Sequence, residues 1–216
     1  MTTAGRISLG LLVAVLALIG VVTFYTLNSD DPAPAPTGPP QAMPAGGGSD
    51  EEEPVRVDDP ELWARCPVEG DDGGDGPLAG VTLACLDGSD DVDLGAVVTG
   101  RPTVVNLWAY WCAPCRKELP AMAEFAELAD GQVDVLTVHI EDGAASGVEL
   151  LESLGVSLPA VADADRLTVA ALGAPRVVPV TVLLDADGEI VETLVVPFET
   201  SAEIADAVRE HLGVDL

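Results

Sequence analysis

The stretch VVNLWAYWCAPCRKELP, residues 104–120, decides the fold, because it sets two cysteines between an apolar run and a helix-favouring run. The largely apolar Thr103–Ala109 predicts a buried strand, and Arg116–Leu128 predicts a helix. Cys112 and Cys115 then fall in the first helical turn, where residues three apart face the same way at roughly 5–6 Å. This spacing suits a disulfide. The strand–CxxC–helix order favours redox chemistry over metal binding.

Two other interpretations of this pair stay open: half of a zinc site, or a purely structural disulfide. Zinc would need a second Cys or His pair at ligand spacing, and His139 and His211 have no such neighbour. His139, near the end of a predicted strand, is expected to be a surface or loop residue. Unpaired N–H groups at the helix N-terminus stabilise a thiolate at Cys112. We therefore expect Cys112 as nucleophile and Cys115 as resolving cysteine, without a metal or other cofactor.

Three segments give the chain a resemblance to a known family. Residues 104–120 resemble the active-site segment of the thioredoxin superfamily, and most closely that of its membrane-anchored TlpA/ResA-like (DsbE/CcmG-like) thiol-disulfide oxidoreductases. VVPVT, residues 177–181, is similar to that family's cis-proline strand, and DADG, residues 185–188, to the hairpin that follows it. The resemblance covers about residues 61–216. It implies a thioredoxin-like α/β sandwich and a thiol-disulfide oxidoreductase activity.

The resemblance also suggests which carboxylate serves the cysteines. Thioredoxins keep a buried Asp six residues before the first Cys, where this chain has Asn106, which cannot exchange protons. TlpA/ResA-like proteins instead carry a Glu six residues after the first Cys, and Glu118 matches that position. Glu118 shares a helix face with Cys115. A partly buried carboxylate there has a raised pKa and can accept the Cys115 proton. The competing interpretation is an exposed helix residue.

Two further features are expected to form the client-binding surface. The resemblance implies that Pro179 follows a cis peptide bond opposite the CxxC, with the Val178 backbone turned outward to pair with an extended peptide. The alternative is a trans proline that ends a loop. Trp111 is expected to pack beside the sulfurs and limit water.

Cys66 and Cys85 have no CxxC partner and lie in a different part of the sequence. The chain has four cysteines, an even number that suits a compartment where disulfides persist. We interpret Cys66 and Cys85 as a structural disulfide. A second redox pair is the less favoured alternative, because neither cysteine precedes an evident helix.

Composition limits the partners and the number of domains. The 216 residues are 48% hydrophobic, which allows one packed domain of ordinary size plus appendages. The net charge is −28, from 37 acidic and 9 basic residues. Nucleic acid and anionic lipid are polyanions that such a surface repels. We therefore expect no nucleic-acid partner.

The N-terminal region predicts a membrane anchor and a tether. Ile7–Leu27 carries no charge and is long enough to span a bilayer. Arg6 before it and acidic residues after it place the N-terminus in the cytoplasm and the rest outside. The competing interpretation is a cleaved signal peptide. The predicted organisation is a signal-anchor at 1–29, a disordered Pro/Gly/acidic linker at 30–60 and a thioredoxin-like domain at 61–216, in a single-pass protein of the cell membrane.

The remaining pattern predicts a central mixed sheet flanked by helices, with an added N-terminal strand element. The helix from Cys112 should end near Ala129 and kink at Pro120. Ser201 is expected to be the N-cap of the last helix. The other expected elements are strands at Val81–Leu86, Val133–Ile140, Val180–Asp185 and Glu189–Val196, a turn with a brief helix at Asp90–Val98, and helices at Gly147–Leu154, Asp165–Leu172 and Ser201–Leu212.

The resemblance implies a physiological role as a reductant. Its clients would be protein thiols and disulfides, including those of apocytochrome c in cytochrome c maturation. Electrons would come from a membrane-embedded donor of the CcdA/DsbD type. The alternatives are a disulfide-forming oxidant, a thioredoxin-fold metallochaperone and a peroxiredoxin-like peroxidase. Arg116 and Lys117 favour the oxidant, since they stabilise the thiolate. The metallochaperone needs a further His or Met ligand, and the peroxidase lacks a CxxC.

Overall fold

Seven strands form one mixed sheet in the computed structural model, which describes residue 66 and residues 74–216. The strands are β1 (Thr82–Cys85), β2 (Val92–Asp93), β3 (Thr103–Trp108), β4 (Asp134–His139), β5 (Ala160–Ala162), β6 (Val180–Leu184) and β7 (Ile190–Leu194). Their order across the sheet is β2-β1-β5-β4-β3-β6-β7. β3 is parallel to β4, β4 is parallel to β5, and the remaining pairs are antiparallel. This is a thioredoxin-like α/β arrangement.

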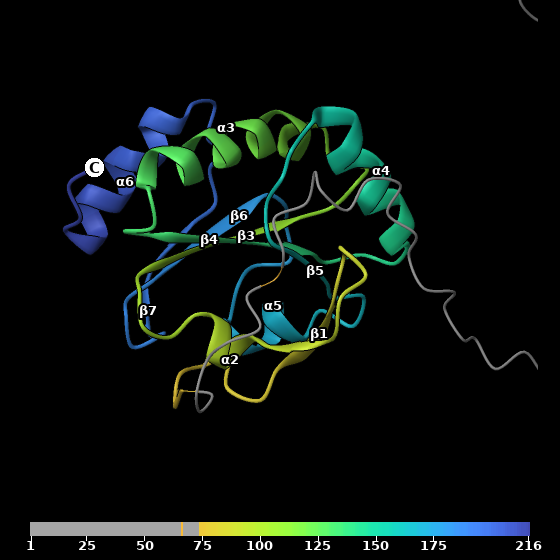
Figure 1. Ribbon diagram of the computed structural model, residues 1–216, viewed down its shortest axis with the longest axis horizontal. Coiled ribbons are helices and arrows are strands. Elements are labelled where there is room, and N and C mark those ends of the chain that lie inside the picture. Colours follow the sequence, from red (N-terminus) through yellow and green to blue (C-terminus); the bar gives the residue numbers. More distant parts are fainter. Residues whose placement is uncertain (1–65, 67–73) are drawn as a thin grey trace, which may run out of the picture. The chain divides into compact units, whose positions relative to one another are not determined.

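Helices cover both faces of this sheet (Figure 1). They are α2 (Leu94–Val97), α3 (Ala113–Ala129), α4 (Ala144–Leu154), α5 (Leu167–Ala171) and α6 (Ser201–Leu212). In Figure 1, α3, α4 and α6 lie on one side of the sheet, and α2 and α5 on the other. Because β3 is covered on both faces, all six of its residues are buried. Its sequence therefore does not alternate between apolar and polar residues, as that of a half-exposed strand would.

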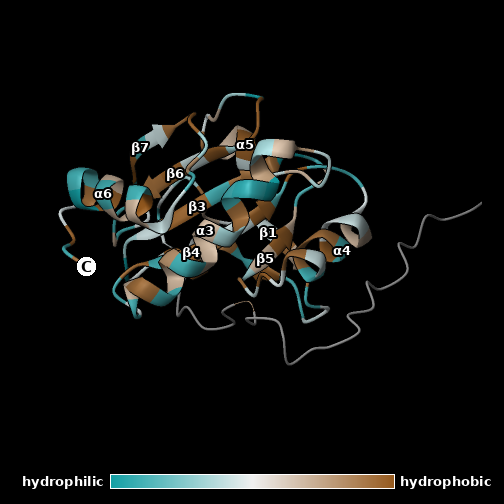
Figure 2. Ribbon diagram, turned by 90° about the horizontal axis from the view of Figure 1, so that it is seen from above, coloured by the Kyte–Doolittle hydropathy of each residue, from teal (hydrophilic) through white to brown (hydrophobic). Residues whose placement is uncertain are grey.

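Two apolar clusters fill the space between the sheet and its helices. One packs under α3, α4 and α6 and contains both active-site cysteines. The other packs under α2 and α5 and contains Cys66 and Cys85. Figure 2 shows the apolar colour concentrated on the central strands and on the inner sides of the helices. Apolar packing therefore holds α3 against one face of the sheet. The N-terminal end of α3 lies where strand β3 ends.

Most predicted elements are present, with small shifts of their ends. α4 begins at Ala144, three residues before the predicted start at Gly147. α3 runs from Ala113 through Pro120 to Ala129 as one helix. The prediction that Ser201 caps α6 was wrong, because Thr200 is the N-cap and its side chain accepts a hydrogen bond from the Glu203 backbone amide. Thr200 is still extended, and a cap residue must lie before the helical dihedrals begin.

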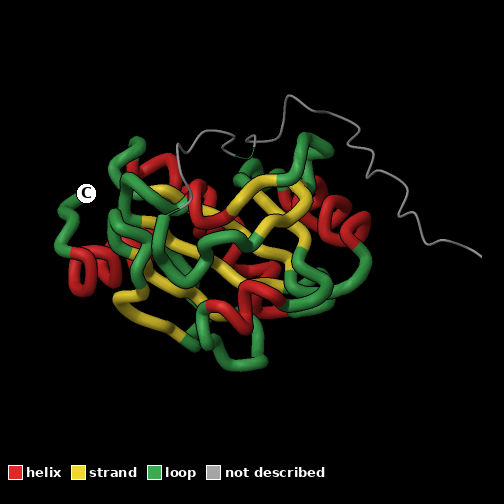
Figure 3. Tube along the Cα trace, turned by 90° about the horizontal axis from the view of Figure 1, so that it is seen from below, coloured by secondary structure: helices red, strands yellow, loops and turns green. Residues whose placement is uncertain are grey.

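Two short strands were not predicted. β5 has three residues, and β2 has two, which is too short for an alternating pattern to appear. β5 is nevertheless central, because it joins β1 to the core of the sheet. Both belong to the seven-stranded sheet, whose strands run through the middle of the fold in Figure 3. The pairing of β5 depends on strands distant in the sequence, whereas β2 pairs with β1, its neighbour along the chain.

The predicted anchor, Ile7–Leu27, and the predicted linker, residues 30–60, lie outside the described residues. In the part of the chain that is described, no helix combines the length and the apolar character that a membrane crossing needs.

Candidate active site

Cys112 and Cys115 form a disulfide at the start of α3, with their Cα atoms 5.3 Å apart. Cys112 is the N-cap, still in extended conformation, and its Sγ accepts a hydrogen bond from the Cys115 backbone amide at 3.2 Å. Pro114 lies in the first turn, where its missing N–H leaves no bond unmade. The predicted strand–CxxC–helix geometry is confirmed. A Cys112 thiolate in this place would receive an N–H bond and the favourable end of the helix dipole.

The two sulfurs differ in their access to solvent. Cys112 is 3% exposed and Cys115 is 0% exposed. This order agrees with the expectation that Cys112 meets the client first. Both are nevertheless buried, so a client must come close to the surface around Cys112 for attack to occur.

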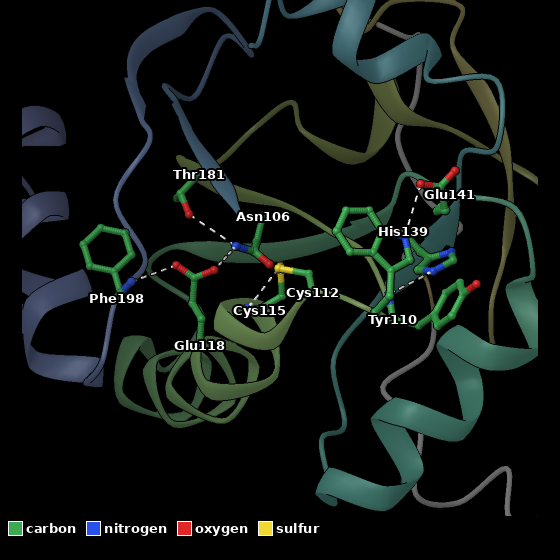
Figure 4. Close-up of a disulfide and its surroundings, with 10 residues drawn as sticks. Asn106, Tyr110, Cys112, Cys115, Glu118, His139, Glu141, Thr181 and Phe198 are labelled. Atoms are coloured by element: carbon green, nitrogen blue, oxygen red, sulfur yellow. Dashed lines mark hydrogen bonds between the residues drawn. A yellow bond between two sulfur atoms is a disulfide. The ribbon is translucent and has the colours of Figure 1, made fainter. Parts of the chain in front are cut away.

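Glu118 lies one turn beyond Cys115 and is fully buried. Its Oε1 accepts a hydrogen bond from the Phe198 backbone amide, and its Oε2 accepts one from Asn106 Nδ2, both at 2.9 Å (Figure 4). Burial raises the pKa of the Glu118 carboxyl, and these two hydrogen bonds oppose the rise. The exposed-residue interpretation is thereby excluded. The carboxylate is held firmly and is poised to bind a proton more readily than an ordinary glutamate.

Asn106 holds this carboxylate from the adjoining strand. Its Nδ2 donates to Glu118, and also lies 3.3 Å from Thr181 Oγ1 on β6. Its Oδ1 is buried and has no hydrogen-bond partner among the described residues. The sequence identified Asn106 only as the place of a missing acid, and its role in fixing Glu118 was not foreseen. A buried polar residue in an otherwise apolar strand was the available signal.

The Val178–Pro179 peptide bond is cis, as expected. Pro179 is buried, Val178 is half-buried, and Val177 is exposed. β6 pairs with β3 so that Leu107 is opposite Val180. Pro179 therefore lies at the end of β3 from which the chain continues to Cys112. The register alone brings the cis-proline segment and the disulfide to the same edge of the sheet.

Trp111 is the residue directly before Cys112, and its side chain is 56% exposed. Its packing beside the sulfurs stays a prediction. Its Nε1 donates to Glu141 Oε2 at 3.2 Å, and the same oxygen accepts from Arg166 at 3.1 Å. These contacts fix the direction of an exposed aromatic side chain directly before Cys112. The geometry suits a contact surface for a partner.

The prediction that His139 is a surface or loop residue was wrong. It is the last residue of β4 and is fully buried. Its ring packs edge-on against Trp108 with centroids 4.8 Å apart, and its Nε2 accepts a 3.4 Å bond from the Tyr110 backbone amide. Burial lowers the pKa of His139 to about 4, against a smaller opposing effect of Glu141. Gly147 allows this packing, because a Cβ there would lie 3.3 Å from the ring.

Cys66 and Cys85 are joined, as predicted, with Cα atoms 6.2 Å apart. Cys85 is the last residue of β1, and the Cys66 backbone amide donates to Asp87 Oδ2 at 3.3 Å. Ligand-type atoms of Cys66, Cys85 and Asp87 lie within 4.8 Å of one another. Because the two sulfurs are bonded to each other, they are not thiolates that hold a metal. The pair joins Cys66 to the end of β1.

Known proteins match the chain over this domain. The Redoxin family matches residues 72–209. Thiol-disulfide oxidoreductase ResA of Bacillus subtilis is 29% identical over 96 residues, which is 44% of this chain and 53% of the relative. Thiol:disulfide interchange protein CycY of Rhizobium leguminosarum bv. viciae is 30% identical over 102 residues, 47% of this chain and 54% of the relative. The chain thus spans about half the length of these curated relatives.

Solved structures agree with this fold. A DsbF homologue from Corynebacterium diphtheriae is 25% identical with a TM-score of 0.54, over 62% of this chain and 85% of that chain. DsbF of Mycobacterium tuberculosis, solved in mixed oxidised and reduced forms, is 23% identical with a TM-score of 0.55, over 62% of this chain and 96% of that chain. The second likeness supports the fold alone. With the family match covering more than half of its length, the chain belongs to the Redoxin family.

Proposed function

We propose that this protein is a thiol-disulfide oxidoreductase that reduces disulfides of client proteins through the Cys112/Cys115 pair. The observation that carries the proposal is the pair's position at the N-terminus of α3, with the buried Glu118 carboxylate one helical turn further. The names of the relatives ResA and CycY support the same chemistry. A structural disulfide would need neither a helix N-terminus nor a buried carboxylate.

The reaction runs in two exchanges of sulfur partners. In the reduced protein, the Cys112 thiolate attacks one sulfur of the client disulfide, and the second client sulfur leaves as a thiolate that takes up a proton from water. Cys115 then attacks Cys112 Sγ and releases the first client sulfur. Glu118 accepts the proton that Cys115 must lose to become nucleophilic. The client gains two electrons, and the protein ends with the Cys112–Cys115 disulfide.

The surface at the edge of the sheet supports binding of an extended client segment. The half-buried Val178 offers its backbone beside the buried Pro179, and Trp111 adds an exposed aromatic side chain. Backbone pairing with Val178 is independent of the client's side chains. We propose that Trp111, Val178 and Pro179 together hold the client while its disulfide meets Cys112.

The physiological setting is also a proposal. The sequence supports a signal-anchor at 1–29, a linker at 30–60 and an extracytoplasmic domain at 61–216 in the cell membrane. In that setting the protein would receive electrons from a membrane-embedded donor of the CcdA/DsbD type and keep client thiols reduced, including those of apocytochrome c. A tether raises the effective concentration of the domain near such a donor.

The decisive experiment is to trap clients with Cys115→Ser. This variant lacks the resolving thiol, so mixed disulfides should accumulate on Cys112 and be released by a reductant. The matched control is Cys112→Ser, which keeps Cys115 and should trap nothing. If the two variants trap equal amounts, or neither traps a client, the proposed function is wrong.

A further inference from the structure

The buried side-chain amide of Asn106 forms hydrogen bonds with the described residues through its nitrogen only. Nδ2 contacts Glu118 Oε2 at 2.9 Å and Thr181 Oγ1 at 3.3 Å. Oδ1 is equally buried, and no group of the described residues donates to it. Buried acceptors of this kind are rare in folded proteins, because they lose their hydrogen bonds to water without replacement. An unpaired oxygen at the centre of a redox site therefore needs a physical reason.

Glu118 fixes which end of the amide faces the cysteines. Its carboxylate already accepts a hydrogen bond from the Phe198 backbone amide, and an ionised carboxylate can only accept. Asn106 must therefore present Nδ2 to it, and Oδ1 is left on the opposite side. In Figure 4, that oxygen points toward the Cys112–Cys115 disulfide.

The two sulfurs differ in their hydrogen-bond partners once the disulfide is reduced. Cys112 Sγ already accepts a hydrogen bond from the Cys115 backbone amide at the helix N-terminus, which favours the Cys112 thiolate. Cys115 is fully buried. On reduction its sulfur gains a hydrogen, which becomes a donor in a place closed to water. The oxidised pair has no hydrogen on either sulfur, so it has no donor for Asn106 Oδ1.

We propose that Asn106 Oδ1 is the acceptor for the Cys115 thiol, in a hydrogen bond that exists only in the reduced protein. The reduction adds two electrons and two protons to the disulfide, and the proton on Cys115 makes this bond. A carbonyl oxygen does not stabilise a neighbouring thiolate, so Asn106 keeps Cys115 protonated until resolution begins. The inference rests on the proposed dithiol chemistry, but the bond itself is tested without turnover.

The direct test is the infrared S–H stretch of Cys115 in a Cys112→Ala background. With Cys66 and Cys85 disulfide-bonded, Cys115 is then the one thiol of the chain. A hydrogen-bonded S–H absorbs at lower frequency than a free one. We expect a lowered band with Asn106 present, a return to the free position in Asn106→Leu, and a lowered band in Thr181→Val, which removes only the other partner of Nδ2.

A free S–H band in the protein with Asn106 intact would overturn the proposal, since the acceptor would then be satisfied in another way, such as by a buried water. An unchanged lowered band in Asn106→Leu would overturn it as well. The band position with Asn106 present decides the question even if Asn106→Leu does not fold. Failure of client trapping by Cys115→Ser would instead count against the proposed function. It would not affect the S–H measurement, which involves no client.

Equilibration with glutathione gives a second, independent readout in proteins with both active-site cysteines. Because the bond is made only in the reduced state, Asn106→Leu should shift the equilibrium about two- to fivefold toward the disulfide, the size expected for a weak S–H donor. Thr181→Val should remain at the wild-type value. A shift of Asn106→Leu toward the dithiol would contradict the proposal.

Discussion

The backbone amide of Phe198 donates a 2.9 Å hydrogen bond to the carboxylate of Glu118, across 80 residues of sequence. It joins the loop between β7 and α6 to the redox helix α3. Burial raises the pKa of the Glu118 carboxyl, and this bond together with that from Asn106 counters part of the rise. The raised pKa makes the Glu118 carboxylate a better proton acceptor than an exposed glutamate.

Glu118→Gln should slow resolution by Cys115 on the order of 100-fold and affect the attack by Cys112 much less. Glu118 accepts a proton only when ionised, so resolution in the wild type should accelerate as pH rises through its raised pKa. The variant should lack that acceleration. Single-turnover release of a mixed disulfide, measured against pH, tests this expectation. Glu127→Gln, at an exposed position of the same helix, is the control, and equal profiles for all three proteins would leave Glu118 without a catalytic role.

His139 should make the protein less stable in mild acid. Its pKa is about 4 in the folded protein and 6.5 in an unfolded chain. The unfolded state therefore binds more protons between these values, and the free energy of unfolding falls as pH drops through this range. Between pH 7 and pH 5 the loss from this residue is about 2 kcal/mol.

Urea unfolding at pH 7 and pH 5 measures this loss, with His139→Phe as the comparison. Phe keeps a ring against Trp108 but cannot be protonated, so the variant should lack that part of the pH dependence. The many carboxylates contribute equally to both proteins and cancel in the difference. An identical pH dependence of the two proteins would show that His139 is not the source.

The Cys66–Cys85 disulfide should stabilise the domain without taking part in the redox cycle. Replacing both cysteines by Ala should lower the free energy of unfolding by roughly 3 kcal/mol. The glutathione equilibrium of the Cys112/Cys115 pair should not change, because the two pairs belong to separate apolar clusters. Peptide mapping of protein from an oxidising compartment should recover the Cys66–Cys85 linkage. Free thiols at both positions, or a bridge to Cys112, would contradict the assignment.

The direction of electron flow should be that of a reductant. The Ala-Pro between the cysteines favours this direction, whereas the exposed Arg116 and Lys117 favour the thiolate and hence an oxidant. Equilibration of wild-type protein with glutathione gives the reduction potential. We expect a value well below that of strong oxidants, and a potential near −120 mV, about that of DsbA, would reverse the assignment.

Local features of the fold could be predicted from the sequence, because they depend on residues a few positions apart. The spacing of Cys112 and Cys115 within one helical turn fixed their disulfide, and the strand before them fixed their place at a helix N-terminus. The hairpin around Asp185–Gly188 follows from the same local signals. The cis bond at Pro179 was implied by the family resemblance and is present.

Burial and pairing between distant elements were decided by the tertiary structure alone. β5 exists only because β1 and β4 lie on either side of it, and His139 is buried because α4 packs closely over it through Gly147. The sequence placed Glu118 on the right helix face. Its burial, its bond to Phe198 and the orientation of the Asn106 amide depend on β3, β6 and the loop before α6 meeting at one point, which no local pattern encodes.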